Sequence, residues 1–150
     1  MELTRRTIKL VLKTADLRNQ WANEDLVNRM QVLMHREGGI GLASNQCGER
    51  VRMFIMLIDG EFWECFNPEI LESTADLTEL TEGCLSFKGE HVIIKRPTKI
   101  NVKYYDSKGK EYVELLEGLP ARCFQHELDH LNGITMHDRY KEQNAEKSRN

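Results

Sequence analysis

The chain has 150 residues, enough for one domain with a sizeable hydrophobic core. Apolar residues make up 40% and charged residues 30%, as in an ordinary soluble protein. The net charge of −3, without a basic block, gives no sign of a nucleic-acid site, and the longest apolar run, 53–58, is too short to cross a membrane. The cysteines are scattered and the N-terminus has no signal-like apolar segment, so we expect a reducing, cytoplasmic location.

The first regular element in the sequence is an amphipathic helix. Residues 24–37 carry apolar side chains at helical spacing, with Asn23 as the expected N-cap. Gly38-Gly39 should end this helix. Residues 7–12, before it, fit either a strand or a helix.

The middle of the chain predicts β structure. Asp59-Gly60 is a strong hairpin turn between two runs of strand-forming residues, and Asn67-Pro68 should break the second run. The predicted strands are 51–58, 61–66, 92–94, 99–105 and 110–116.

The spacing of the apolar residues changes at Gly118 from a strand-like to a helix-like period, and a second helix should follow. Pro120 suits the first turn of a helix, and Asn132-Gly133 should stop it. Its apolar residues are spread around the helix, so we expect it to be central and largely covered. Residues 139–150 are polar and predict a frayed surface tail. We therefore predict one α+β domain over residues 1–150, with mostly antiparallel strands around the second helix.

The stretch His126-Glu127-Leu128-Asp129-His130 lies in that helix. Two histidines four residues apart lie on one helix face, about 6 Å apart, and can bind one metal ion. Glu127 can act as general base on a water bound to the ion. Two histidines near a helix C-terminus also fit a plain structural role, because a positive side chain favours the helix dipole there. The motif alone leaves both interpretations open.

A catalytic site of this kind usually has three protein ligands. Downstream, His137, Glu142 and Glu146 are available, but they lie in or near the polar segment. Upstream, Cys84 lies in the stretch 82–86, EGCLS, where glycine lets the backbone approach a metal closely. Alone, Cys84 fits a small buried apolar residue. Beside the two histidines, it becomes the candidate third ligand.

The stretch 39–46, GIGLASNQ, forms the third cluster. A helix end followed by a turn would account for its glycines, and the absence of a GK[ST] sequence argues against a phosphate loop. Such glycines also let a substrate backbone lie against the chain. The amide N–H₂ of Gln46 could stabilise an oxyanion.

GIGLASNQ, EGCLS and QHELDH, in this order and spacing, resemble the three signature motifs of the peptide deformylases. These metalloenzymes remove the formyl group from the N-terminal formyl-methionine of newly made proteins. The resemblance covers residues 38–138. It is weaker at residues 13–18, where the proline-containing opening typical of the family is not evident.

The resemblance implies roles for residues in all three motifs. The family's metal ligands match Cys84, His126 and His130. Its catalytic groups match the Glu127 carboxylate, the Gln46 amide and the Leu85 backbone N–H. Its substrate-binding positions match Ile40, Gly41 and Gly83, with Cys123 near the methionine pocket. Asp129 points off the ligand face, and we expect it either to support a metal ligand from behind or to have a structural role, without chemistry of its own.

The family commonly uses Fe²⁺, and thiolate and imidazole ligands also accept Zn²⁺ or Ni²⁺. The implied partners are formyl-methionine N-termini of nascent peptides, with transient proximity to the ribosome. Many bacterial members continue into a long C-terminal helix that helps them meet the ribosome. This chain ends soon after Asp138-Arg139, so we expect no docking helix. Two positions depart from the family pattern: Ser44 replaces the usual alanine, and Lys88 replaces a common proline.

Two other functions remain compatible with the HELDH motif. A zinc endopeptidase would cleave internal peptide bonds and be indifferent to formylation. A non-catalytic metal or peptide-binding module would lack a competent base. Glu127 and Gln46 are both present in this sequence, which argues against such a module.

Overall fold

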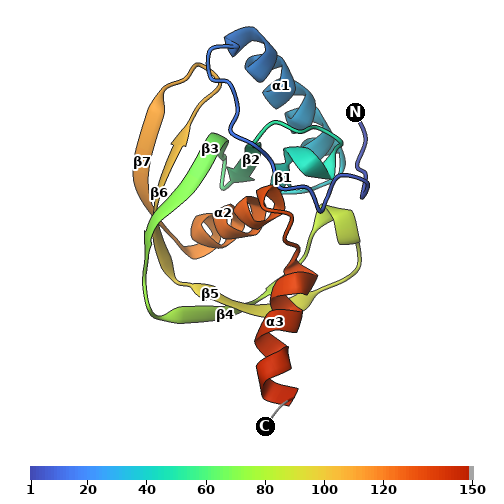
Figure 1. The fold of residues 1–150 in the computed structure, drawn as a ribbon, viewed down its shortest axis with the longest axis vertical. Helices are drawn as coiled ribbons and strands as arrows, with labels where there is room; N and C mark the ends of the chain where they lie inside the picture. Colours follow the sequence, from blue (N-terminus) through green and yellow to red (C-terminus); the bar gives the residue numbers. More distant parts are fainter. Residues whose placement is uncertain (149–150) are drawn as a thin grey trace.

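The computed structural model describes residues 1–148. The part of the chain that it describes contains three α-helices, two short 3-10 turns and seven strands (Figure 1). They follow in the order α1 (Gln20–Arg36), β1 (Gly41–Ala43), η1 (Ser44–Gln46), β2 (Met53–Ile58), β3 (Glu61–Ser73), β4 (Leu77–Glu82), η2 (Leu85–Phe87), β5 (Val92–Pro97), β6 (Lys99–Tyr105), β7 (Glu111–Glu117), α2 (Gly118–Leu131) and α3 (Met136–Ser148). None of the described helices has the length and apolar character needed to span a bilayer.

The strands form two antiparallel sheets. The larger sheet has the order β1-β2-β3-β6-β7, and β4 pairs with β5 in a two-stranded sheet. The two sheets curve around α2, while α1 lies at one end of the molecule against β1 and β2 (Figure 1). The predicted α+β class with mostly antiparallel strands is confirmed.

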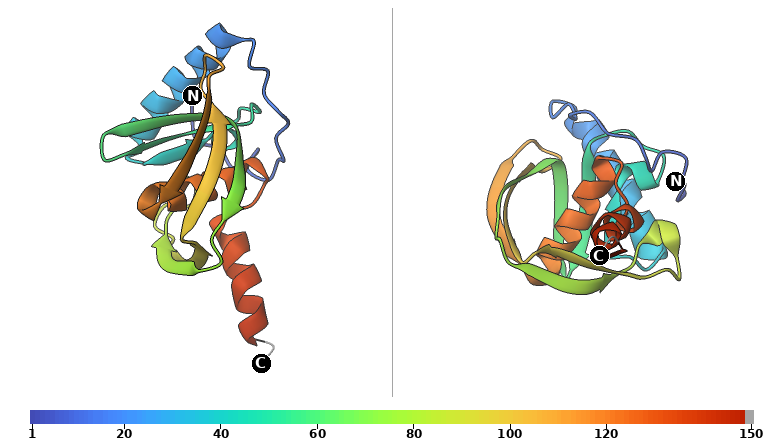
Figure 2. Two further views of the ribbon diagram at one scale, coloured as in Figure 1. Left: turned by 90° about the vertical axis from the view of Figure 1, so that its left-hand side faces the viewer. Right: turned by 60° about the horizontal axis from the view of Figure 1, so that its bottom comes forward.

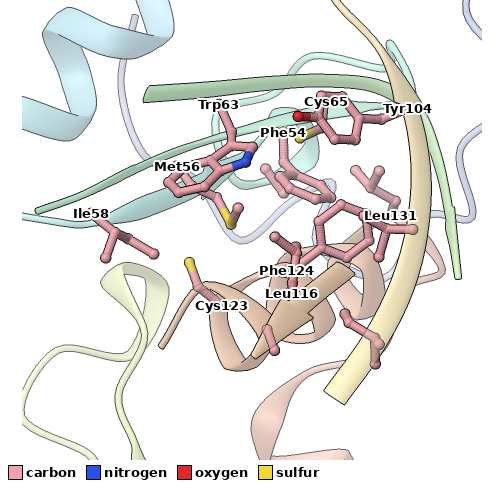
Figure 3. Close-up of a cluster of buried hydrophobic side chains, with 14 of the residues drawn as sticks. Phe54, Met56, Ile58, Trp63, Cys65, Tyr104, Leu116, Cys123, Phe124 and Leu131 are labelled. Carbon is pink, nitrogen blue, oxygen red and sulfur yellow. The ribbon is translucent and has the colours of Figure 1, made fainter. Parts of the chain in front are cut away.

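Strand β2 shows how the core is divided between the two helices. Met53 and Ile55 pack in one cluster with side chains of α1. Phe54 and Met56, which alternate with them, pack in a second cluster with Phe124 of α2 (Figure 3). Because successive side chains of a strand point to opposite faces, β2 is buried on both faces. This explains why its sequence is an almost continuous apolar run.

Helix α1 differs from the prediction at its start. It begins at Gln20, and the expected N-cap, Asn23, lies inside its first turns. The Asn23 side chain is buried and donates a hydrogen bond to the Asp16 carbonyl at 3.1 Å, so its amide ties the helix to the preceding segment. Gly38, with φ +72°, ends the helix as predicted. Residues 7–12 form turns and one isolated bridge, and neither a strand nor a helix.

Strand β3 continues through Asn67-Pro68, where the sequence predicted a break. Asn67 has φ +49°, and the register with β6 shifts between Phe66 and Glu69. Asparagine tolerates this left-handed conformation, so a bulge replaces the break. The Asn67 amide bonds both backbone groups of Ala15, at 2.7 and 3.1 Å, which holds the bulge in place.

The prediction of a frayed C-terminal tail is wrong, because residues 136–148 form helix α3. Arg139 pairs with Asp129 of α2, and the Gln143 amide bonds both backbone groups of Lys95 in β5, at 2.9 and 2.8 Å. These polar contacts dock the helix, whose far end extends away from the body (Figure 2). The last two residues of the predicted tail, 149–150, lie outside the described residues.

Replacing Phe124 with alanine should destabilise the fold strongly. Its ring is fully buried and lies edge-on to Phe54, with 5.0 Å between the ring centroids. We expect Phe124→Ala to lower the free energy of unfolding by about 3–5 kcal/mol, measured by urea denaturation. The control is Leu115→Ala on β7, where the side chain is 68% exposed and the change should stay within about 0.5 kcal/mol. Equal effects of the two substitutions would contradict this assignment of the core.

Candidate active site

Three side chains that can ligate a metal meet between α2 and the β4–η2 segment. Cys84 follows β4, and His126 and His130 lie on one face of α2, edge to face, with 5.0 Å between their ring centroids. One ligand atom from each residue lies within 4.8 Å of the others. The Cys84 Sγ to His130 Nε2 distance is 3.4 Å. Two ligand atoms on one tetrahedral ion lie roughly 3.5 Å apart, so a thiolate and two imidazoles so placed fit a divalent metal.

His126 is oriented from behind by Glu82, the last residue of β4. The His126 Nδ1 lies 2.9 Å from a Glu82 carboxylate oxygen. Arg96 donates to both Glu82 oxygens at 2.6 and 2.9 Å, and Arg122 donates to one of them at 2.8 Å. Because the ionised Glu82 accepts the Nδ1–H, the His126 Nε2 is left free for a metal.

Burial disfavours the charged form of Glu82, but hydrogen bonds from His126 and Arg96 outweigh it and hold the Glu82 pKa well below its usual range. Burial also lowers the pKa of His126. There, hydrogen bonds with Cys84 and Glu82 and the charges of Glu127 and Cys84 raise it to about 10. The surroundings of His126 therefore favour positive charge at its Nε2, which a bound metal ion would supply in place of the proton.

Glu127 points toward the cavity from the same helix. Burial raises the pKa of its carboxyl to about 7. Its Oε1 is buried and has no hydrogen-bond partner among the described residues. A Cβ added to Gly41 would lie 2.5 Å from Glu127 Oε2 and 2.7 Å from Cys123 Sγ. The carboxylate thus lies directly against strand β1, in the space that a glycine leaves open.

Gln46 reaches the same place from η1. Its Oε1 accepts the backbone N–H of Ala43 at 2.8 Å, which fixes the orientation of the amide. Its Nε2 donates to Ser86 Oγ at 3.0 Å and lies 3.5 Å from Cys84 Sγ. Leu85, next to Cys84, begins η2 and packs its side chain against Gly39. An amide donor and a backbone turn therefore both lie next to the cysteine.

A cavity of about 370 Å³ joins these groups. Apart from His130, which is fully buried behind it, every site residue predicted from the motifs lines this cavity. These residues are Ile40, Gly41, Gln46, Gly83, Cys84, Leu85, Cys123, His126 and Glu127. The structure thus brings the three predicted motifs together.

Sequence reasoning gave no role to Glu82, Arg96 or Arg122, nor to the cavity-lining side chains of His91 and Leu119. The sequence of β5 does contain one indication that Arg96 is buried. Its alternation puts Arg96 on the same buried face as Ile94. A buried arginine requires a carboxylate partner, but the sequence alone did not identify Glu82 as that partner.

Comparison with known proteins agrees with the motifs. Residues 5–146 match the family described as Polypeptide deformylase. The chain is 43% identical over 115 residues to a peptide deformylase of Thermotoga neapolitana, covering 77% of this chain and 70% of that protein.

Solved structures agree as well. The crystal structure of peptide deformylase from Thermotoga maritima superposes with a TM-score of 0.86 at 35% identity, covering 93% of this chain and 97% of that one. PDF from the Vibrio parahaemolyticus bacteriophage VP16T, in complex with actinonin, superposes with a TM-score of 0.85 at 33% identity, covering 91% of this chain and 100% of that one. The chain therefore belongs to the peptide deformylase family, enzymes that remove N-formyl groups and depend on a metal ion.

Proposed function

We propose that this chain hydrolyses the formyl group from formyl-methionine N-termini of nascent polypeptides, with one divalent ion held by Cys84, His126 and His130. The observation that carries the proposal is the meeting of these three groups with Glu127 and Gln46 at one cavity. Fe²⁺ is the proposed native ion, and Zn²⁺ or Ni²⁺ could substitute. When bound, the ion would act as a Lewis acid and lower the pKa of the attacking water.

Glu127 is the proposed proton carrier. A carboxyl with a pKa of about 7 can both take and return a proton near neutral pH. Glu127 would hold the proton that the attacking water loses and hand it to the nitrogen of the departing amine. The products are then formate and a peptide with a free N-terminal methionine. The buried Oε1, without a partner among the described residues, is available for this exchange.

Gln46 and the Leu85 backbone N–H are the proposed donors to the oxyanion that develops on the formyl oxygen. The Gln46 amide cannot turn freely, because its Oε1 accepts the Ala43 N–H at 2.8 Å. A donor oriented before the reaction needs no reorganisation as charge develops. Both donors lie next to Cys84, because Gln46 Nε2 is 3.5 Å from Cys84 Sγ and Leu85 follows Cys84 in the chain.

The substrate would lie along β1, the edge strand of the larger sheet. Its backbone would pair with the chain near Ile40 and Gly41, and Gly83 would border it from the other side. The methionine side chain would enter the apolar end of the cavity beside Cys123. Transient proximity to the ribosome and a cytoplasmic location stay predictions.

Deformylation can be tested with two peptides. Protein loaded anaerobically with Fe²⁺ or Ni²⁺ is incubated with formyl-Met-Ala-Ser or acetyl-Met-Ala-Ser, and released formate and free amine are measured. We expect formate from the first peptide and no free amine from the second. Fully loaded protein that releases no formate would overturn the proposal, and cleavage of internal bonds in both peptides would indicate an endopeptidase.

Substitutions at Glu127 and Cys84 should separate chemistry from metal binding. Glu127→Gln should keep one equivalent of metal and lose turnover by about 10³-fold, because general acid–base catalysis is removed. Cys84→Ala should lose the metal, measured by elemental analysis after gel filtration. Glu61→Gln, on an exposed strand end, is the control for a carboxylate remote from the site. Full metal content in Cys84→Ala would show that the ligand set is wrong.

Gly41→Ala should lower kcat and leave metal content unchanged. The added Cβ would lie 2.5 Å from Glu127 Oε2, so the carboxylate must move from its place. We expect a loss of at least about tenfold, because small misplacements of catalytic groups cost large factors in rate. Gly83→Ala gives the comparison, because its Cβ would meet only His91, at an ordinary 3.4 Å, and should cost less. A Gly41→Ala protein with parental kcat would show that displacement of Glu127 by this contact does not affect turnover.

A further inference from the structure

Arg139, near the start of α3, contacts Asp129 of α2, a residue that does not itself line the cavity. Its Nη2 and Nε donate to the two Asp129 oxygens, at 2.8 and 3.0 Å. This is a two-pronged pair of the kind that the planar arginine fork forms with a carboxylate. The Asp129 side chain is 10% exposed and that of Arg139 is 32% exposed, so the pair is largely shielded from water.

Asp129 links Arg139 to residues that lie closer to the candidate metal ligands. Its Oδ2, which already accepts from Arg139, also accepts from Arg96 Nη1 at 2.8 Å. The other two guanidinium nitrogens of Arg96 donate to Glu82, and a Glu82 oxygen lies 2.9 Å from His126 Nδ1. A continuous line of charged hydrogen bonds therefore joins α3 to a candidate metal ligand. Arg96 is its central member, because Asp129 and Glu82 share it.

The sharing of Arg96 makes the two ends of this line depend on each other. Asp129 has two cationic partners, Arg96 and Arg139. If Arg139 is removed, Arg96 alone must satisfy the largely buried Asp129 carboxylate, and the attraction toward Asp129 increases. A buried carboxylate that loses a partner is costly, so the remaining partner adjusts to it. Any movement of Arg96 toward Asp129 loosens its two-pronged hold on Glu82.

We propose that Arg139 is a positioning residue for His126, acting through Asp129, Arg96 and Glu82. Helix α3 would then be part of the support of the metal site, although none of its described residues lines the cavity. The inference rests on the ligand set of the proposed function. It concerns the affinity and geometry of the metal site and does not require that the bound metal be catalytic.

The test compares metal binding in three variants loaded with Co²⁺. Affinity is measured by competition with a chromophoric chelator, and ligand geometry by the visible absorption of bound Co²⁺. Arg139→Ala should weaken affinity by about tenfold, the lower end of the range for outer partners of metal ligands, and should shift the absorption bands. Arg139→Lys keeps the charge and loses the fork, so it should recover part of the affinity. It also replaces Arg139→Ala if that variant does not fold.

Gln143→Ala is the matched control. It removes another polar attachment of α3, to Lys95 of β5, and leaves the contacts of Asp129 unchanged. We expect it to keep the affinity and spectrum of the parent protein. An Arg139→Ala protein that is folded and has parental affinity and spectrum would overturn the proposal. Equal losses in Gln143→Ala and Arg139→Ala would also overturn it, because they would assign the effect to docking of α3 in general.

The outcome is separable from that of the proposed function. Parent protein that binds Co²⁺ tightly and releases no formate in its Fe²⁺ or Ni²⁺ form would overturn deformylation and still allow the comparison of affinities. Unchanged affinity in the folded Arg139 variants would overturn the positioning role while deformylation stands.

Discussion

The buried carboxylate of Glu82 is the group on which the geometry of the site depends. It ends β4 and accepts hydrogen bonds from Arg96 of β5 and from Arg122 and His126 of α2. A carboxylate buried without such partners would be strongly destabilising, so the two-stranded sheet and the helix have to meet at this point. Cys84 lies two residues further along the chain. Pairing of Glu82 therefore also sets where the cysteine stands relative to the histidines.

Helix α2 contributes to both the hydrophobic core and the candidate site because one of its sides is apolar and the other is polar. Phe124 and Leu131, seven residues apart, belong to the hydrophobic cluster against the larger sheet (Figure 3). Arg122, His126 and Asp129 follow the spacing i, i+4 and i+7 and make up a polar stripe that bonds residues of β4 and β5. The apolar side holds the helix between the sheets, and the polar stripe fixes its rotation. Both are needed to direct His126 and His130 toward Cys84.

Local signals in the sequence predicted much of the fold, and contacts between distant residues account for the rest. Strand 99–105 was predicted with its observed bounds, because its alternation and the flanking turns are local features. The bulge at Asn67 depends on Ala15, which a local pattern does not reveal. In the site, motif order predicted that Cys84 lies with the histidines. The partners of Glu82 were missed because strand pairing and helix packing bring them together only in the folded chain.

Two buried carboxylates near His126 have opposite pKa shifts, and this difference supports different tasks for them. Glu82 is surrounded by donors and cations that keep it ionised, although burial opposes the charge. Glu127 has a pKa of about 7, because burial raises it and attraction by His126 offsets only part of the effect. An anion held by hydrogen bonds at both oxygens is suited to fix a histidine and cannot readily take a proton. A carboxyl poised near neutral pH, with an oxygen that lacks a partner among the described residues, is suited to exchange one. Glu82, which is paired with cations, is thus suited to support His126, whereas Glu127, which lies at the cavity, is suited to transfer a proton.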